Sequence, residues 1–173
     1  MSDNESTTTA KEWTIVVSDL PILGDVIAYD LLDENGAHVK PTDSLGKVLG
    51  INFWATWCVP CREEFPDLEA AFQAHSAAGY TMHGVDSYDL AEPADLAAWR
   101  QLNPLLTYPL LLDKGVSFID TLLSYSAQYG TGSITLPQTV LVDRNGKVRF
   151  YKLGKLGAGE LDSALAKLVP YAP

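Results

Sequence analysis

The chain has 173 residues, of which 47% are hydrophobic and 20% are charged. This composition predicts one domain with a buried core and excludes disorder of the whole chain. The formal net charge is -10, because 22 acidic residues outweigh 12 basic ones. Nucleic acids and anionic membrane surfaces are therefore not expected partners, since both are bound by clustered Lys and Arg.

Residues 1–12 are predicted to be a disordered polar leader, because the first ten residues are mostly Ser, Thr, Asn, Asp and Glu. They carry no export signal, and no stretch of the chain is apolar over the length that crosses a bilayer. Two interpretations of the leader stay open: a frayed terminus without a role, or the spacer that remains after a leader or lipid anchor is removed. Residues 13–173 are expected to form a single domain.

The first part of that domain is predicted to be β-structure. The β-like runs are Trp13 to Val17, Val26 to Leu32 and Ala37 to Lys40. We expect the last two runs to pair as an N-terminal hairpin, because the Asn-Gly step between them favours a tight turn. The apolar run Val48–Trp54 predicts a central strand buried on both faces, in which Gly50 indicates close backbone packing.

A helix is predicted from Cys58 to Ala78, kinked at Pro66, because apolar residues recur on one face at spacings of four, three and four. Strands and helices then alternate to the end of the chain. The predicted ranges are a strand over 80–85, a helix over 92–102, an extended run over 108–112, a helix over 116–129, a hairpin of 139–142 and 147–153, and a helix over 159–168. This series predicts an α/β fold with a mixed central sheet between helical layers, an N-terminal hairpin extension and an inserted strand and helix.

The two cysteines of the chain are three residues apart, in Trp57-Cys58-Val59-Pro60-Cys61. Two cysteines are too few for a disulfide framework, so their spacing is the informative feature. Because Cys58 follows a buried strand and opens a helix, unpaired amides and the helix dipole should stabilise its thiolate. A free thiol titrates near about 8.5, and thiols in such pairs fall to roughly 3.5–7.5. We expect Cys58 to be the nucleophile and Cys61 to resolve the mixed disulfide.

The residues beside the cysteines have secondary roles in this interpretation. Trp57 is expected to touch a partner, and Pro60 to stiffen the helix start and tune the redox potential. The alternative, half of a zinc site, lacks a second cysteine pair. The remaining candidate ligands have plainer positions on strands or at a helix end, so no metal is expected: His38, His75 and His83.

Two segments of the chain carry a resemblance to a known family. The first is Asn52-Phe-Trp-Ala-Thr-Trp-Cys-Val-Pro-Cys-Arg-Glu-Glu-Phe-Pro66, and the second is Leu136-Pro-Gln-Thr-Val-Leu-Val-Asp143, followed by an Asn-Gly step. Together they resemble the TlpA/ResA-like branch of the thioredoxin superfamily, and the likeness spans about residues 25–168. The resemblance implies a thioredoxin fold and thiol–disulfide oxidoreductase activity, with the redox-active disulfide Cys58-Cys61 and no cofactor.

The resemblance also implies roles for residues outside the cysteine pair. Leu136 and Pro137 match the family's cis-proline loop, which lies against the cysteines and offers backbone groups to an extended substrate. Asn52 stands where thioredoxin has a buried Asp that handles the proton of the inner cysteine. Glu64 matches a glutamate that lies near the cysteines and influences their acidity. Its other interpretation, a solvated carboxylate in an early helical turn, stays open.

The segment over 114–135 is longer than the family's usual connection. One interpretation is a helix that covers the sheet edge better, and the other is a helix that shapes a partner groove. The role of this segment stays open at this stage.

The first functional hypothesis is an extracytoplasmic reductase of client disulfides, acting in cytochrome c maturation or surface-protein repair and recharged by a membrane electron donor. It would be a monomer that is membrane- or lipid-anchored, or cytoplasmic if this N-terminus is native. The second hypothesis is a disulfide donor that uses the same residues. The third is a copper chaperone on a thioredoxin fold, although Sco-like carriers use a wider cysteine spacing and a distal loop histidine, whereas His83 lies in a strand pattern.

Overall fold

The computed structural model describes residues 20–113 and 120–171. The predicted leader over 1–12 and the predicted strand from Trp13 to Val17 lie outside these residues. No described helix has both the length and the apolar composition required to cross a membrane.

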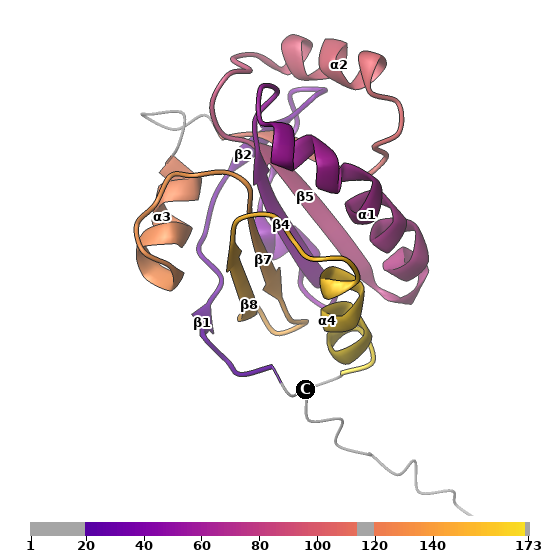
Figure 1. Cartoon of the computed structure of the whole chain (residues 1–173), viewed down its shortest axis with the longest axis vertical. Coiled ribbons are helices and arrows are strands. Elements are labelled where there is room, and N and C mark those ends of the chain that lie inside the picture. The colour runs from indigo at the N-terminus through magenta and orange to yellow at the C-terminus, as the bar shows by residue number, and fades with distance from the viewer. Residues whose placement is uncertain (1–19, 114–119, 172–173) are drawn as a thin grey trace, which may run out of the picture.

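The described strands form one mixed sheet in the order β1-β8-β7-β4-β5-β6-β2-β3 (Figure 1). Parallel pairing joins β4 to β5 and β5 to β6, and the other neighbours pair antiparallel. The strands are β1 (Gly24–Asp25), β2 (Leu31–Asp33), β3 (His38–Val39), β4 (Val48–Trp54), β5 (Tyr80–Asp86), β6 (Leu110–Leu112), β7 (Gln138–Val142) and β8 (Lys147–Leu153). The fold predicted from the sequence, a mixed sheet between helical layers, is confirmed.

The described helices are α1 (Val59–His75), α2 (Pro93–Leu102), α3 (Asp120–Tyr129) and α4 (Glu160–Leu168), with short 3₁₀ turns over Pro41–Ser44 and Ser76–Ala78. In Figure 1, α1 and α4 lie side by side in front of the sheet, and they contact each other. The first helix was predicted to reach Ala78. The α-helix ends three residues earlier, at His75, and a 3₁₀ turn follows it before Gly79. The α-helix continues through Pro66.

The central strand β4 is buried along its whole length, as its apolar sequence predicts. Its side chains alternate between two helical layers. Trp54 packs on Phe65 of α1, with ring centroids 5.6 Å apart, whereas Phe53 packs on Tyr125 of α3 at 5.8 Å. The sheet therefore has α1 on one face and α3 on the other.

The two predicted hairpin turns are present, each with a three-residue loop. A two-residue Asn-Gly turn needs a positive φ at both residues, but among the described residues only glycines have positive φ. The φ angles are 78° at Gly36 and 77° at Gly146. In each turn an aspartate side chain, Asp33 or Asp143, accepts hydrogen bonds from the amides two and four residues later. These are three-residue loops closed by an Asx interaction, and the predicted tight turns at the two Asn-Gly steps are confirmed.

The inserted helix α3 holds the N-terminal part of the described chain against the sheet. The Tyr125 hydroxyl accepts from the amide of Ile27 and donates to its carbonyl, both at 3.1 Å. The Tyr129 hydroxyl donates to the carbonyl of Asp25. The helix was predicted to begin at 116, and 114–119 lie outside the described residues. The interpretation of this segment as additional cover for the sheet accounts for these contacts.

Gly50 allows a close approach within the sheet, as predicted. A Cβ atom at this position would lie 2.4 Å from the Tyr80 hydroxyl oxygen. That hydroxyl is buried and has no hydrogen-bond partner among the described residues. Gly50 and Tyr80 therefore form a tight contact in which one polar atom is unpaired.

We predict that Gly50→Ala lowers the free energy of unfolding by about 1–3 kcal/mol, because the added methyl group overlaps the Tyr80 hydroxyl. Tyr80→Phe should leave stability unchanged or raise it, because it removes a buried unpaired polar group. The double variant should recover part of the loss. Urea denaturation measures all three, and a Gly50→Ala protein as stable as wild type would contradict the prediction.

Candidate functional site

The cysteine pair lies where the central strand ends and α1 begins. Cys58 is the N-cap of α1, and Pro60 lies in its first turn. Cys58 and Cys61 form a disulfide, and the Cys58 sulfur accepts a hydrogen bond from the Cys61 amide at 3.2 Å. Cys58 is 3% exposed and Cys61 is fully buried. The sulfur of Cys58 thus lies at the amide end of a helix, where negative charge is favoured.

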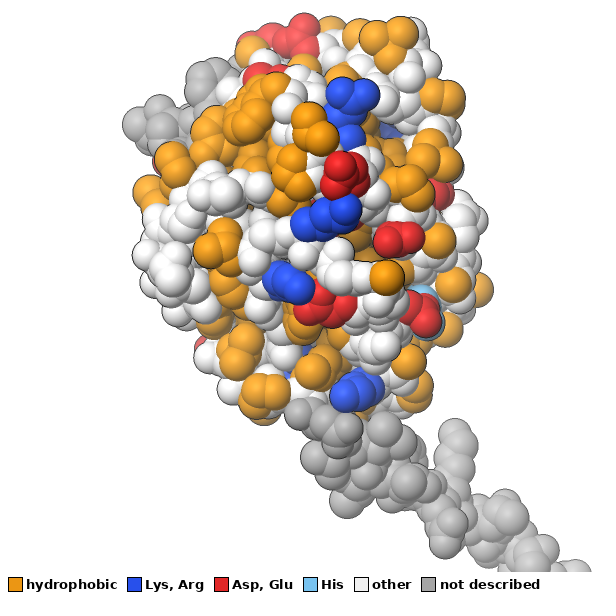
Figure 2. Space-filling view, in the orientation of Figure 1, with side chains coloured by type: hydrophobic (Ala, Val, Ile, Leu, Met, Phe, Trp, Pro, Cys, Tyr) orange, Lys and Arg blue, Asp and Glu red, His pale blue; other side chains and the backbone are white. Residues whose placement is uncertain are grey.

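Hydrophobic side chains are exposed around this disulfide. Trp57 is 60% exposed, and its ring packs edge-on against Tyr88 with centroids 5.5 Å apart. Val59 and Ile134 are also exposed, and the Tyr88 hydroxyl donates to the Ile134 carbonyl at 2.7 Å. In Figure 2, hydrophobic side chains gather at the end of the molecule where α1 begins. This surface suits an apolar partner segment better than a charged one.

The Leu136-Pro137 peptide bond is cis, as the family resemblance implied. The Pro137 carbonyl accepts a hydrogen bond from the Gly154 amide at 2.8 Å, which ties the loop to the end of β8. Neither the amide nor the carbonyl of Leu136 bonds to another residue within 20–113 or 120–171. Two backbone groups of the loop are thus left for an external strand.

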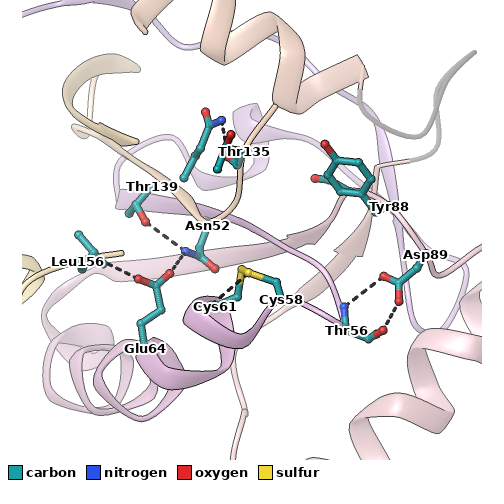
Figure 3. The surroundings of a disulfide bond; sticks show 12 residues. Asn52, Thr56, Cys58, Cys61, Glu64, Tyr88, Asp89, Thr135, Thr139 and Leu156 are labelled. Atoms are coloured by element: carbon teal, nitrogen blue, oxygen red, sulfur yellow. Dashed lines mark hydrogen bonds between the residues drawn. A yellow bond between two sulfur atoms is a disulfide. The ribbon is translucent and has the colours of Figure 1, made fainter. Parts of the chain in front are cut away.

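Glu64 is buried, at 2% exposure, on the face of α1 that carries Cys61. Its carboxylate accepts from Asn52 Nδ2 at 2.7 Å and from the Leu156 amide at 3.0 Å (Figure 3). Burial raises the pKa of Glu64 above its ordinary value, and these two hydrogen bonds oppose the rise. The interpretation of Glu64 as a solvated carboxylate was therefore wrong.

Asn52 joins Glu64 to the sheet. Its Nδ2 also donates to the Thr139 hydroxyl on the neighbouring strand β7, at 3.1 Å. Its Oδ1 is buried and has no partner among the described residues. This unpaired buried oxygen has the capacity to accept a hydrogen bond.

A second carboxyl cluster lies on the other side of the disulfide in Figure 3 and was missed in the sequence. Asp89 accepts from the Thr56 amide at 3.2 Å and from its hydroxyl, which fixes the turn that leads into Cys58. Buried Asp86, at the end of β5, accepts from the amides of Tyr88, Asp89 and Leu90. Burial and the nearby Asp89 carboxyl raise the pKa of Asp86. The signal that was available was an Asp directly after the strand predicted over 80–85.

Comparison with known proteins identifies the family. The sequence profile of the AhpC/TSA family matches residues 23–151. The thiol-disulfide oxidoreductase ResA of Bacillus thuringiensis (strain Al Hakam) is 31% identical over 143 residues, which cover 82% of this chain and 75% of that protein. The chain belongs to the AhpC/TSA family, in its TlpA/ResA-like branch. Like its ResA relatives, this TlpA/ResA-like protein is a thiol–disulfide oxidoreductase, and its Cys58 and Cys61 are joined in a disulfide.

Solved structures agree with this assignment to the TlpA/ResA-like branch. A crystal structure of a protein assigned as the thiol:disulfide interchange protein DsbE, from Chlorobium tepidum, has a TM-score of 0.68 at 26% identity and covers 87% of this chain and 99% of its own. The thioredoxin domain of a thiol-disulfide oxidoreductase from Bacteroides vulgatus has a TM-score of 0.70 at 25% identity, with coverages of 86% and 99%. The thioredoxin fold expected from the sequence is confirmed.

The three histidines of this TlpA/ResA-like protein lie apart from each other, on β3, at the end of α1 and on β5. His83 is buried, with its Nδ1 2.6 Å from the Tyr29 hydroxyl, and burial lowers its pKa to about 4. Within residues 20–113 and 120–171, no three His, Cys, Asp or Glu side chains are grouped so that they could hold a metal ion.

The raised pKa of Glu64 predicts a pH dependence of stability. The folded protein holds the Glu64 proton more tightly than the unfolded chain, whose glutamates titrate near about 4.3. The free energy of unfolding should therefore decrease as the pH rises from about 4 to the folded-state pKa. The Glu64→Gln protein lacks this titration. Its free energy of unfolding, measured relative to that of wild type, should therefore rise over that interval and then stay constant.

Urea denaturation of both proteins at a series of pH values measures this difference. Glu63→Gln is the matched control, because Glu63 is exposed and its ion pair with Lys155 is screened by water. A stability difference between Glu64→Gln and wild type that is independent of pH would contradict the prediction.

Proposed function

We propose that the protein is a reductase of client protein disulfides, in which Cys58 is the nucleophile and Cys61 the resolving cysteine. The Cys58 thiolate attacks a client sulfur, the client disulfide breaks, and one client thiolate leaves. Cys61 then loses its proton and attacks the Cys58 sulfur, so the second client thiolate leaves as the Cys58-Cys61 disulfide forms. Two electrons pass to the client. The observation that carries this exchange mechanism is the Cys58 sulfur at the N-cap of α1, where it accepts a hydrogen bond from the Cys61 amide. The reducing direction rests instead on the carboxyl groups near the pair.

The proposed client-binding residues surround this sulfur. Trp57 is exposed beside it, Pro60 stiffens the first turn of α1, and Leu136 and Pro137 form the cis-proline loop. An extended client segment would pair with the free amide and carbonyl of Leu136 by strand addition. This arrangement would place a client cysteine next to Cys58.

Glu64 is proposed to accept the Cys61 proton when Cys61 attacks. The support is its burial, its place three residues after Cys61 on the same helical face, and its pKa, which burial raises towards that of a useful general base. Asn52 holds the carboxylate in place from β4. Glu64→Gln should therefore slow the resolution step in addition to changing stability.

The charges near the disulfide support the reducing direction. A disulfide is a strong oxidant when its thiolates are specially stabilised, because this favours the reduced form. Here carboxylates approach the pair from both sides: Glu64 lies on the α1 face, and Asp89 holds Thr56 of the preceding turn. Negative charge near a thiolate raises its energy, which favours oxidation of the pair and reduction of the client.

The cellular setting is part of the same proposal. We place the protein outside the cytoplasm on a membrane or lipid anchor, as a monomer that a membrane electron donor re-reduces, with cytochrome c maturation as one setting for its clients. The support is the family resemblance and the polar composition of residues 1–10.

The roles of the two cysteines predict different products for their serine variants. Prereduced Cys58→Ser should show no exchange with a peptide that carries a disulfide bond, because the nucleophile is gone. Prereduced Cys61→Ser should accumulate a mixed disulfide between Cys58 and the peptide, because nothing displaces the client. Mass spectrometry without reductant distinguishes these products. Full turnover by Cys58→Ser would refute the mechanism.

The reduction potential tests the direction. We expect a value near thioredoxin's roughly -270 mV, and a value near about -120 mV would instead identify a disulfide donor with the same site. Equilibration of the Cys58-Cys61 pair with dithiothreitol buffers, followed by the fluorescence of the adjacent Trp57, measures it.

A further inference from the structure

The loop before the cis-proline is held by side chains that bond to its carbonyls. Gln138 Nε2 donates to the carbonyls of Ser133 and Thr135, each at 2.8 Å. The Tyr88 hydroxyl donates to the carbonyl between them, that of Ile134. Three successive carbonyls are thus turned towards the protein. They come immediately before Leu136, whose amide and carbonyl have no hydrogen-bond partner within the described residues.

Gln138 is well placed to fix this loop. It is the first residue of β7, directly after Pro137, and is fully buried. Its Oε1 accepts a hydrogen bond from the Tyr151 hydroxyl at 2.6 Å. Because a tyrosine hydroxyl can donate to the amide oxygen but the loop carbonyls can only accept, these partners fix which end of the carboxamide faces the loop.

The Tyr151 side chain passes the end of α3 to reach Gln138. Val140 pairs with Tyr151 across β7 and β8, so Gln138, two residues before Val140, lies on the same sheet face as Tyr151. At Gly130, which follows α3, a Cβ atom would lie 2.4 Å from the Tyr151 hydroxyl oxygen. A side chain at position 130 would displace Tyr151, so the glycine keeps this path open.

We propose that Gln138, held by Tyr151, is a positioning residue that presets the 133–136 loop for an extended client segment. The inference rests on the proposed function. Strand addition at Leu136 needs an amide and a carbonyl in a fixed orientation, and a loop that is already ordered loses less conformational freedom on binding. Within the described residues Gln138 makes no hydrogen bond to Cys58 or Cys61, and it acts through the loop.

Two substitutions separate this role from simple packing. Gln138→Glu keeps the shape and the acceptor for Tyr151, but the ionised carboxylate has no proton for the Ser133 and Thr135 carbonyls and repels them. Gln138→Met removes both bonds without adding a charge. Loss of two such bonds should weaken client binding by about tenfold or more.

The test is single-turnover reduction by the prereduced protein of a peptide that carries a disulfide bond. The peptide concentration for half-maximal rate should rise about tenfold or more in Gln138→Glu and Gln138→Met, with the limiting rate nearly unchanged. The reaction with the small disulfide 5,5′-dithiobis(2-nitrobenzoate), which cannot add a strand, should match wild type. Lowering the pH should restore peptide affinity in part in Gln138→Glu, because the protonated carboxyl has one O–H to donate in place of the two N–H donors of the carboxamide, and not in Gln138→Met.

Gln128→Glu is the matched control, because Gln128 is exposed on α3 and bonds only to the neighbouring Tyr129 within the described chain. It should behave like wild type. Tyr151→Phe provides a second test if a Gln138 variant does not fold, and it should also raise the half-saturating peptide concentration, because the carboxamide is free to turn.

Three results would overturn the inference. They are unchanged peptide affinity in the folded Gln138 and Tyr151 variants, an equal loss towards the peptide and the small disulfide, and no difference in pH response between Gln138→Glu and Gln138→Met. Absence of exchange in the wild-type protein with either disulfide would instead refute the proposed function, so the two failures are distinguishable.

Discussion

The chemistry of this protein depends on where one helix begins. Cys58 is the N-cap of α1, so its sulfur faces the unpaired amides of the first turn. It accepts a hydrogen bond from the amide of Cys61. The position is set by β4, whose seven residues are all buried and lead into the turn before Cys58. Because a fully buried strand cannot shift its register without exposing apolar side chains, the start of the helix is fixed with respect to the sheet. A thiolate can then be stabilised by backbone groups alone, with no cationic side chain required.

The two sides of the disulfide have different surroundings. Towards α1, Glu64 and Asn52 form a buried polar group, and burial raises the pKa of the Glu64 carboxyl. Towards the surface, Trp57 is exposed and the cis-proline loop carries Leu136. In the proposed mechanism, proton transfer takes place in the buried interior, where an ionisable group responds strongly to its neighbours, and client binding takes place on the apolar surface. The inserted helix α3 is connected to the proposed client-binding loop as well, because Tyr151 passes its end to reach Gln138.

Much of the fold could be predicted because its signals are local. The apolar run of β4, the periodicity of α1 and the Cys-x-x-Cys at their junction each depend on neighbours in the sequence, and the structure agrees with them to within a few residues. The hairpin turns were predicted in the right places, and the Asx interactions of Asp33 and Asp143 give them their three-residue geometry. The first helix was predicted three residues too long, because its last turn tightens into 3₁₀ geometry before Gly79.

The sequence by itself determined the fold class, the cysteine pair and the place of Cys58 at a helix start, since hydrophobic period and residue spacing are properties of adjacent positions. Only the tertiary structure decided whether Glu64 is solvated or buried, because its partners Asn52 and Leu156 come from distant parts of the chain. The same holds for the Asp86 and Asp89 cluster. It also holds for the hydrogen bonds that connect Tyr151 to Gln138 and Gln138 to the 133–136 loop. Burial and hydrogen bonding across the sheet depend on which elements pack together, and no local pattern encodes that contact.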